Sequence, residues 1–467
     1  METLLQGYFQ AFQGKTVAVL GAGVSNKPLI ALLLAAGADL TIRDKSTREG
    51  FDAAVVEQWE HQGAKLRLGE DYLEDLTEDV IFRSPGIMPH TPQLAAAVAR
   101  GSVLCSEMEA FFQLCPCPIM AVTGSDGKTT TTSIIAGLLK AAGYTVWVGG
   151  NIGTPLLDKV DEMRQNHRVV LELSSFQLMT MTQSPHIAVV TNVAPNHLDK
   201  HTDMDEYVTA KGNILAYQKS YDRAILNYDN PTAAAFAETA PGKVIWFSRQ
   251  GAPEGEAVFC KDGAIWVRDQ RGERSVLERG DILLPGEHNV ENYMAAIAAV
   301  KELVPAQTIR DFARNFGGVE HRIELCGDFR GVRWYNDSIA SSPSRTIAGL
   351  RAFAEKLILI AGGYDKHIPY DVLGPEVVAH VKRLILTGDT AGKIRSAVEA
   401  APGYDPAKLP IVEVPDLAAA VAEAARTAEE GDVVLMSPAS ASFDHFKNFM
   451  ERGNVFKALV AQLKERE

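Results

Sequence analysis

A glycine-rich segment carries the residues of this chain that are best suited to bind phosphate. Residues 123–130 read TGSDGKTT and lie between a β-branched apolar stretch and a threonine-rich helical pattern. Gly124 and Gly127 allow backbone N–H groups to approach phosphate oxygens, and a helix N-terminus adds about half a positive charge. Lys128 can reach the β- and γ-phosphates, and the Thr129 hydroxyl can ligate Mg²⁺. The segment therefore predicts a nucleotide site.

The same loop lacks one glycine of the common phosphate-binding pattern. In G-x-x-x-x-G-K-[ST] the first glycine stands five residues before the second, and here Val122 occupies that position. The missing glycine changes the turn but not the contributions of Lys128, Thr129 and the backbone amides. A glycine turn before a buried helix is the alternative that these residues alone leave open.

Candidate metal ligands follow the neighbouring apolar strands. Glu172 ends one strand, and an acid in such a place holds Mg²⁺ in many phosphate-loop proteins. Asn192 and His197 follow another strand, and Lys211 falls on a predicted helix. Without the rest of the pattern, Glu172 could equally be a solvated carboxylate rather than a metal ligand. In the same way, His197 could be an ordinary loop histidine and Lys211 an ordinary surface lysine.

A second glycine turn lies near the N-terminus. GAGVSN at 21–26 follows the apolar strand 16–20, but Asn26 stands where the dinucleotide fingerprint G-x-G-x-x-G has its third glycine. Asp44 ends the next strand about twenty residues on, where an acid contacting a ribose or base would lie. On these residues alone, a nucleotide site and a structural turn remain equally open.

Apolar strands alternate with amphipathic helices, which predicts an α/β protein of mainly parallel sheets covered on both faces. A chain of 467 residues is too long for one hydrophobic core. We predict three domains, 1–116, 117–318 and 319–467, the first ending near the proline-containing CPCP segment. The predicted strands include residues 16–20, 39–44, 118–124, 168–175, 187–193, 223–229, 357–363, 383–389 and 432–440.

Composition narrows the classes of function. The net charge of −13 argues against broad nucleic-acid binding, which needs a basic surface. No apolar run is long enough to span a bilayer, and METLLQGYFQ lacks the features of a secretory signal. The five cysteines are scattered and lack zinc-site spacing, which favours reduced thiols in the cytoplasm.

Taken together, the motifs resemble the Mur ligase family of ATP-dependent amide-forming enzymes. The shared segments are TGSDGKTTT, GGNIG, LELSSFQL, NVAPNHLD, YVTAKGNI, LPGEHNVEN, EHRIE, NDSIASSP and SPASASFDHFKNFMERG. The family loop, T-G-x-x-G-K-[ST], has no outer glycine, which explains Val122. The segments LGAGVSNKPL, GGYDK and SPASASFDHFKNF favour the members that add D-glutamate to UDP-N-acetylmuramoyl-L-alanine.

The resemblance implies a Rossmann-like UDP-binding domain, a central P-loop ATPase domain and a C-terminal Rossmann-like domain that binds the amino acid. It also implies the contacts of each substrate. ATP would be held by Gly124, Ser125, Asp126, Gly127, Lys128, Thr129 and Thr130, with Asn289, Asn292, Arg322 and Asp337. The UDP substrate would be held by Gly23, Val24, Ser25, Asp44, Ser84, Pro85, Gly86, Asn151 and Ser174. D-Glutamate would be held by Lys366, Ser442, Phe443 and Phe449.

Catalysis is implied at Lys128, His197 and Lys211. The family binds two Mg²⁺ ions, for which Thr129, Glu172, His197 and Lys211 are the matching ligands. Lys211 would act as a carbamate, since this supplies an anionic oxygen. A substrate carboxylate would attack the γ-phosphate of ATP, and the D-glutamate amine would attack the acyl phosphate through a tetrahedral intermediate. We expect a cytoplasmic monomer that makes a peptidoglycan precursor.

Ser341 replaces a threonine of the family pattern, and two further positions depart from it in charge. Ile339 stands where many members carry lysine, and Asn196 where many carry aspartate. Three alternatives remain. One is another Mur-family or folylpolyglutamate-type ligase with a different amino acid. The second is a nucleotide-dependent switch, although NKPL lacks the aspartate of N-K-x-D. The third is an NAD-dependent dehydrogenase using GAGVSN, which leaves residues 124–129 unexplained.

Overall fold

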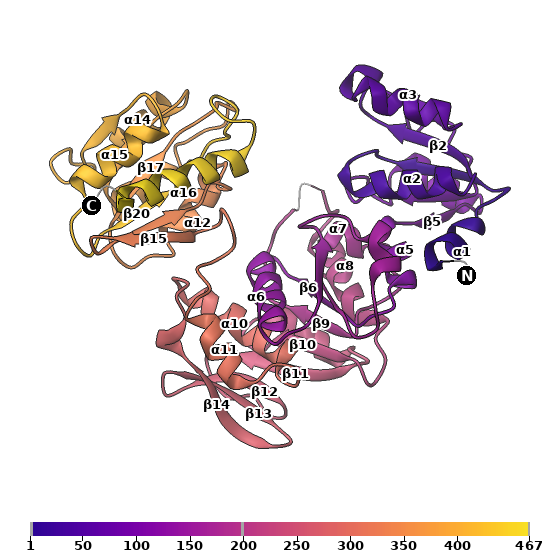
Figure 1. The fold of residues 1–467 in the computed structure, drawn as a ribbon, viewed down its shortest axis with the longest axis horizontal. Helices are drawn as coiled ribbons and strands as arrows, with labels where there is room; N and C mark the ends of the chain where they lie inside the picture. The colour runs from indigo at the N-terminus through magenta and orange to yellow at the C-terminus, as the bar shows by residue number, and fades with distance from the viewer. Residues whose placement is uncertain (1–2, 198–199, 466–467) are drawn as a thin grey trace. The chain divides into compact units, whose positions relative to one another are not determined.

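The computed structural model describes residues 3–197 and 200–465, which form two compact units. One unit contains residues 3–197, 200–281 and 288–313, and the other contains residues 282–287 and 314–465. The first unit holds two β-sheets and the second holds one, each accompanied by helices (Figure 1).

The first sheet is parallel throughout, in the order β3-β2-β1-β4-β5. Its strands are β1 (Thr16–Leu20), β2 (Asp39–Asp44), β3 (Lys65–Leu68), β4 (Val80–Arg83) and β5 (Val103–Cys105). Its helices are α1 (Leu4–Gln10), α2 (Lys27–Ala35), α3 (Ala53–His61), α4 (Pro92–Ala99) and α5 (Glu107–Leu114), with 3₁₀ turns η1 (Val24–Asn26) and η2 (Arg48–Gly50). In β1, Val17 and Val19 join one apolar cluster while Ala18 and Leu20 join another, so both faces of the sheet are covered.

The central sheet has the order β14-β13-β12-β11-β10-β9-β6-β8-β7. Its strands are β6 (Ile119–Thr123), β7 (Val146–Gly150), β8 (Arg168–Glu172), β9 (Ile187–Val190), β10 (Arg223–Asn227), β11 (Lys243–Ser248), β12 (Ala257–Lys261), β13 (Ala264–Asp269) and β14 (Gly272–Glu278). Its helices are α6 (Lys128–Ala141), α7 (Ser175–Leu178), α8 (Met204–Ala216), α9 (Pro231–Ala235), α10 (Glu287–Val300) and α11 (Ala306–Ala313), with η3 (Leu157–Glu162), η4 (Phe236–Glu238) and η5 (Arg279–Asp281).

The strands from β7 to β12 pair in parallel, whereas β12, β13 and β14 form antiparallel hairpins. The first hairpin turns at Asp262 and Gly263, both of which have positive φ. Asp-Gly between two strands is the usual signal for a two-residue hairpin. The dipeptide Asp262-Gly263 therefore indicated an antiparallel hairpin at this edge, which the prediction of mainly parallel sheets did not take into account.

The second unit is built on a six-stranded sheet of order β15-β16-β20-β17-β18-β19, in which only β15 is antiparallel. Its strands are β15 (Glu324–Phe329), β16 (Val332–Asn336), β17 (Leu357–Ala361), β18 (Val381–Leu386), β19 (Ile411–Glu413) and β20 (Val433–Met436). Its helices are α12 (Pro343–Leu350), α13 (Leu373–His380), α14 (Ala391–Glu399), α15 (Leu417–Thr427) and α16 (Phe449–Glu465). Two apolar clusters cover its faces, since Leu359 of β17 belongs to one and Ile358 and Ile360 belong to the other.

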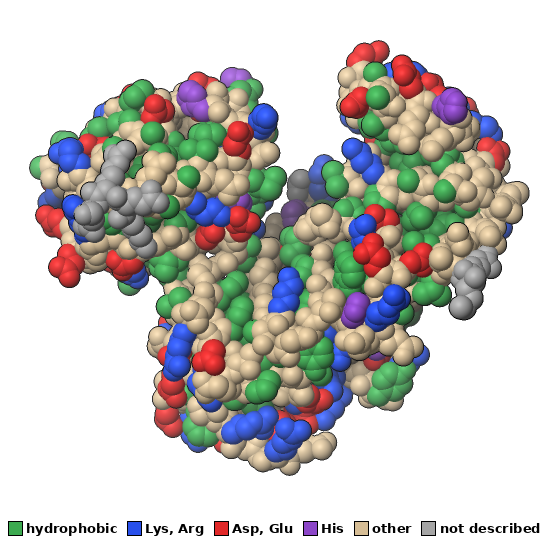
Figure 2. Space-filling model, viewed as in Figure 1, with side chains coloured by type: hydrophobic (Ala, Val, Ile, Leu, Met, Phe, Trp, Pro, Cys, Tyr) green, Lys and Arg blue, Asp and Glu red, His purple; other side chains and the backbone are tan. Residues whose placement is uncertain are grey.

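The predicted fold class, α/β with mainly parallel sheets, is confirmed, and a strand is present in each segment where one was predicted. The domain boundaries at 116 and 318 stay a prediction. In residues 3–197 and 200–465, no helix is both long and apolar enough to cross a membrane. Acidic and basic side chains are interspersed on the face of the molecule shown in Figure 2.

Two helical glycines of the second unit differ in the space around them. One is packed closely against a neighbouring helix, and the other is limited only by the low helix propensity of glycine. A Cβ at Gly374 on α13 would lie 2.1 Å from the carbonyl oxygen of Ala397 on α14, whereas a Cβ at Gly392 on α14 would meet no atom within 4 Å. We predict that Gly374→Ala lowers stability by about 1–3 kcal/mol, and that Gly392→Ala raises it by up to about 1 kcal/mol. Thermal denaturation of the two variants measures this, and shifts of the same sign would contradict it.

Candidate functional site

The glycine-rich loop joins β6 to α6 in a conformation that requires both of its glycines. Gly124 and Gly127 have φ values of +150° and +77°, which L side chains rarely adopt. A Cβ at Gly124 would lie 1.9 Å from Thr191 Oγ1, and a Cβ at Gly127 would lie 2.4 Å from Asn292 Oδ1. The loop is therefore packed against the residue after β9 and against α10 as closely as the backbone allows.

Residues that follow β9 also hold the loop by hydrogen bonds. The Ser125 N–H donates to the Asn192 carbonyl at 2.9 Å, and the Asp126 N–H donates to Asn192 Oδ1 at 2.9 Å. Thr191 Oγ1 donates to the Asp126 carbonyl at 2.6 Å. The Ser125 hydroxyl is buried against the Ala194 carbonyl at 2.8 Å. The side chains of Ser125 and Thr191 thus shape the loop, a role that the sequence did not indicate.

Two lysines converge on one carbonyl of this loop. Lys128 Nζ donates to the Gly124 carbonyl at 3.0 Å and to the Ser125 carbonyl at 2.9 Å. Lys211 Nζ, from α8, donates to the same Gly124 carbonyl at 2.8 Å. Lys211 is only 1% exposed and lies over the Tyr207 ring. Burial and the charge of Lys128 lower the pKa of Lys211 to about 7.

Glu172 is the centre of a second group of polar contacts beside the loop. Its buried carboxylate accepts a hydrogen bond of 2.7 Å from Thr129 Oγ1 and one of 2.8 Å from Asn151 Nδ2. A carboxylate next to a hydroxyl is a set of hard oxygen donors, which suits Mg²⁺. The structure therefore brings together Thr129, Glu172 and Asn151, which the sequence placed on three different elements.

His197 occupies a tight turn after β9. Its φ is +56°, a left-handed value in which histidine is enriched. Its N–H donates to Asn196 Oδ1 at 2.9 Å, and its ring lies edge-on to Phe176 at 5.2 Å. Asn196, one of the two departures from the family pattern, therefore supplies the oxygen that caps this turn and carries no charge. In residues 3–197 and 200–465, no three His, Cys, Asp or Glu side chains are grouped closely enough to hold a metal ion.

Asn289 and Asn292 lie side by side on α10 and are both buried. Asn292 Oδ1 accepts a 3.1 Å hydrogen bond from Thr131 Oγ1, and Asn292 Nδ2 donates to Asn289 Oδ1 at 3.0 Å. Asn292 is also the residue against which Gly127 packs. The pair therefore lies directly next to the phosphate loop, and its contact with adenine stays a prediction.

A cavity of about 230 Å³ lies in the same unit, beside the N-terminal glycine turn. Four residues predicted to bind the UDP substrate line it: Val24, Ser25, Pro85 and Asn151. Other lining residues were missed by the sequence, among them Arg83, Glu107 and Gln177. Gly23, Ser84 and Gly86 adjoin lining residues in the chain.

Asp44 and Ser174 have partners within the protein. Asp44 Oδ2 accepts from the Ala22 N–H at 2.7 Å, and Asp44 Oδ1 accepts from the Ser46 N–H at 2.8 Å. Ser174 caps α7. Asn26 Nδ2 donates to the Gly21 carbonyl at 2.8 Å. In place of a third glycine, this chain thus has a buried amide that fixes the turn.

Arg322 and Asp337 lie in the second unit. Asp337 is buried, and its carboxylate accepts from Ser437 Oγ at 2.7 Å and from the Ile323 N–H at 3.3 Å. Burial raises the pKa of Asp337 to about 7, although Ser437 and the charge of Arg322 act in the opposite direction. Ile339, the second departure from the family pattern, accepts a hydrogen bond on its carbonyl from Arg345 at 3.2 Å, so a guanidinium lies close to this position.

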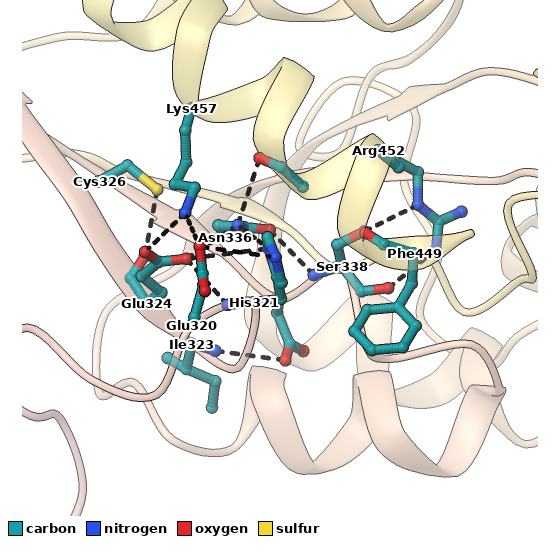
Figure 3. A network of polar contacts seen from close by, with 12 residues as sticks. Glu320, His321, Ile323, Glu324, Cys326, Asn336, Ser338, Phe449, Arg452 and Lys457 are labelled. Atoms are coloured by element: carbon teal, nitrogen blue, oxygen red, sulfur yellow. Dashed lines mark hydrogen bonds and ion pairs between the residues drawn. The ribbon is translucent and has the colours of Figure 1, made fainter. Parts of the chain in front are cut away.

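The turn that carries Arg322 is strained and is fixed by a polar network. His321 and Ile323 have φ values of +63° and +43°. A positive φ is unusual for a β-branched residue such as Ile323. The His321 N–H donates to Glu324 Oε2 at 2.8 Å, and Asn336 Nδ2 lies 3.0 Å from His321 Nδ1. Lys457 of α16 donates to Glu320 at 2.6 Å and to Glu324 at 3.2 Å (Figure 3).

The residues predicted to bind D-glutamate lie on loops of the second unit and at the start of α16. Ser442 is buried, Phe443 is 60% exposed and Lys366 is exposed. The Phe449 carbonyl accepts a hydrogen bond from Ser338 Oγ at 2.7 Å. The ring of Phe449 lies edge-on to the ring of His321, with 6.0 Å between the two ring centres.

Arg452, which the sequence did not single out, is buried among the loops that carry these residues. It donates to Ser338 Oγ at 3.0 Å and to the carbonyls of Ser338, Ala441 and Ser440 at 2.9, 2.9 and 3.1 Å. Its guanidinium thereby ties the loop after β16 to the loop after β20 (Figure 3).

Comparisons with known proteins agree over most of the chain. A family model described as Mur ligase middle domain matches residues 122–300, and one described as Mur ligase, glutamate ligase domain matches residues 321–440. The UDP-N-acetylmuramoylalanine–D-glutamate ligase of Acetivibrio thermocellus is 51% identical over 98% of this chain and 99% of its own length. The protein of the same name from Ruminiclostridium cellulolyticum is 47% identical over 99% of this chain and all of its own length.

Solved structures support the fold. A UDP-N-acetylmuramoyl-L-alanyl-D-glutamate–2,6-diaminopimelate ligase matches with a TM-score of 0.55 and 20% identity, over 83% of this chain and 93% of that chain. A UDP-N-acetylmuramate–alanine ligase from Thermotoga maritima matches with a TM-score of 0.53 and 16% identity, over 97% of this chain and all of that chain. At these identities the similarity concerns the fold alone.

The close packing at Gly124 generates a test of the loop. We predict that Gly124→Ala reduces the affinity for a nucleoside triphosphate at least tenfold, because a methyl group meets Thr191 and the backbone cannot hold its φ. Titration with a fluorescent ATP analogue measures this. Gly251→Ala is a control, because Gly251 has no positive φ and a Cβ there would meet no atom within 4 Å, and it should leave nucleotide affinity within twofold. Unchanged affinity of the Gly124 variant would contradict the assignment.

Proposed function

Because this chain belongs to the Mur ligase family, we propose that it is an ATP-dependent ligase that joins D-glutamate to UDP-N-acetylmuramoyl-L-alanine. The proposal is supported by full-length similarity to relatives named for that reaction. The structural observation that carries it is the loop at residues 124–129, where Lys128, Lys211 and the Thr129–Glu172 pair converge. Because the chain belongs to this family, we no longer consider an NAD-dependent dehydrogenase or a nucleotide-dependent switch as its function.

The arrangement of the loop accounts for how a carboxylate could be activated. Lys128 and the N-terminus of α6 would hold the phosphates of ATP, so that a substrate carboxylate oxygen attacks the γ-phosphorus and ADP leaves. The amine of D-glutamate then attacks the acyl phosphate carbon, and phosphate leaves from the tetrahedral intermediate. Lys128 offsets the negative charge that the three substrates bring to one place.

We assign the metal positions to Thr129, Glu172, His197 and a carbamate on Lys211. Mg²⁺ bound there would neutralise charge on the phosphate oxygens. The carbamate forms when the neutral amine of Lys211 adds to CO₂ and releases one proton. A pKa of about 7 leaves a large neutral fraction at physiological pH, which favours this addition. We propose two Mg²⁺ ions because four ligand groups are available. The carbamate and the Thr129 hydroxyl add oxygen ligands to those of the Glu172 carboxylate.

The substrate contacts form part of the same proposal. The UDP substrate would occupy the cavity beside the N-terminal glycine turn, and Asn151, which donates to Glu172, would connect that cavity to the metal position. D-Glutamate would be held by Lys366, Ser442, Phe443 and Phe449. A monomeric state, a cytoplasmic location and a role in peptidoglycan precursor synthesis also remain predictions.

The choice of amino acid tests the function directly. With UDP-N-acetylmuramoyl-L-alanine, ATP and Mg²⁺, we expect ADP formation to depend on D-glutamate and to be at least a hundredfold slower with L-glutamate, L-alanine or L-lysine. A coupled ADP assay with analysis of the product by mass spectrometry measures this. Faster turnover with another amino acid, or with a folate as acceptor, would identify a different ligase of the same type.

The carbamate predicts a particular rescue. Lys211→Ala should lower kcat at least a hundredfold, because it removes an oxygen ligand of the metal, and short carboxylates such as acetate should restore part of the activity by occupying the vacated space. The same acids should not rescue Lys128→Ala, which removes a positive charge. Equal rescue of both variants, or full activity of Lys211→Ala, would count against the carbamate.

A further inference from the structure

Two residues that line the cavity beside the N-terminal glycine turn each have a buried side-chain atom without a partner. The atoms are Glu107 Oε1 and Arg83 Nε, and neither has a hydrogen-bond partner among residues 3–197 and 200–465. Glu107 is 7% exposed and Arg83 is 1% exposed. Buried polar groups are nearly always paired, because an unpaired group has lost its hydrogen bonds to water without replacement. A polar ligand in the cavity would supply the partners that these two side chains lack.

A second glutamate on the same helix shows what a structural role looks like. Glu107 and Glu109 both lie in the first turn of α5 and are both buried. Glu109 accepts hydrogen bonds from the N–H and hydroxyl of Thr182 at 3.3 and 3.4 Å and pairs with Ser106 Oγ at 3.2 Å. Glu109 does not line the cavity, whereas Glu107 does. The carboxyl group of Glu109 is thus paired within the protein interior, whereas Glu107, which has a backbone hydrogen bond at Leu157, lies at the cavity with one carboxyl oxygen, Oε1, unpaired.

The charge state of Glu107 suits a site for an anionic ligand. Burial and the negative charge of Asp158 on η3 raise the pKa of Glu107 to about 8, so the group is largely neutral at pH 7. A neutral carboxyl group does not repel phosphates or a carboxylate, and it can donate one hydrogen bond and accept another. This combination matches amide and hydroxyl groups, which also both donate and accept.

Arg83 brings a fixed positive charge to the same wall. Arg83 Nη1 donates to the Ile87 carbonyl at 2.6 Å and to the Pro85 carbonyl at 3.4 Å. Arg83 Nη2 donates to the Phe176 carbonyl at 2.8 Å and to Thr180 Oγ1 at 3.2 Å, which leaves Nε–H as the donor without a partner among the described residues. These bonds hold the loop that carries Ser84, Pro85 and Gly86 against the end of α7. The free N–H is consequently held in place and available for an acceptor oxygen of a ligand.

We propose that Glu107 is a substrate-binding residue that pairs with an amide or hydroxyl group of the N-acetylated sugar, next to a ligand oxygen that accepts a hydrogen bond from Arg83 Nε–H. This inference rests on the proposed function, because it takes the nucleotide sugar to be the ligand of the cavity. Asn151 also lines the cavity and donates to Glu172 beside the phosphate loop, so the cavity adjoins the proposed site of reaction, where the sugar end of the substrate would lie. Glu107 therefore distinguishes the sugar-bearing substrate from UDP alone.

Calorimetric titration of the full chain, without ATP or D-glutamate, tests this. Glu107→Leu should raise the Kd for UDP-N-acetylmuramoyl-L-alanine about tenfold and leave the Kd for UDP within twofold. Glu107→Gln should bind the substrate within about threefold of the wild type, since an amide reproduces the neutral acid. Glu107→Ala, measured in parallel, should weaken substrate binding in the same way if the leucine variant does not fold.

Glu109→Leu is the matched control, and the two leucine variants should show opposite patterns. Glu109→Leu should lower Tm, because it leaves the Thr182 donors unpaired, and keep substrate affinity. Glu107→Leu should keep or raise Tm, because it removes an unpartnered polar atom, and lose affinity. Wild-type substrate affinity in Glu107→Leu, or an equal loss of UDP affinity, would overturn the inference and leave the proposed function standing. If the wild-type chain binds no UDP-N-acetylmuramoyl-L-alanine, both the inference and the proposed function fall.

Discussion

The Gly124 carbonyl oxygen accepts hydrogen bonds from two lysine ammonium groups, and much of the first unit serves to keep them there. Lys128 begins α6, and Lys211 comes from α8. Like charges held so close, one of them almost fully buried, are costly unless an anion or a change of protonation compensates them. The lowered pKa of Lys211 reflects this cost, and a polyphosphate or a carbamate would relieve it.

The parallel sheet explains how these groups meet. β6 lies between β8 and β9, and the three strands end at the same edge. The loop after β6, Glu172 at the end of β8 and the residues after β9 are thereby brought together. Thr191 and Asn192 support the loop from one side, and Asn292 of α10 packs against it from another. This closeness explains why Gly124 and Gly127 are required, whereas the outer glycine of the commoner pattern is not.

The second unit uses buried charge for a different purpose. Arg452 donates only to the Ser338 hydroxyl and to backbone carbonyls, and Lys457 bridges Glu320 and Glu324 around a turn with two left-handed residues (Figure 3). These contacts hold Arg322, Asp337 and Phe449 on one set of loops. The residues that we propose to contact the nucleotide and the amino acid from this unit are therefore held by one polar network.

The sequence by itself determined the fold class, the strands and the residues with chemistry in the phosphate loop, because these depend on local pattern and on residue type. Glu172 could be named as a candidate metal ligand from its place at a strand end beside a phosphate loop, whereas His197 and Lys211 could be named as candidates only through the family resemblance, since each alone fits an ordinary surface role. Only the tertiary structure decided that Asn26 fixes a turn, that Arg452 joins two loops, and that Glu107 lines a cavity while Glu109 does not. Two glutamates two residues apart are alike in a sequence pattern, and their difference arises from the partners that distant segments bring to each.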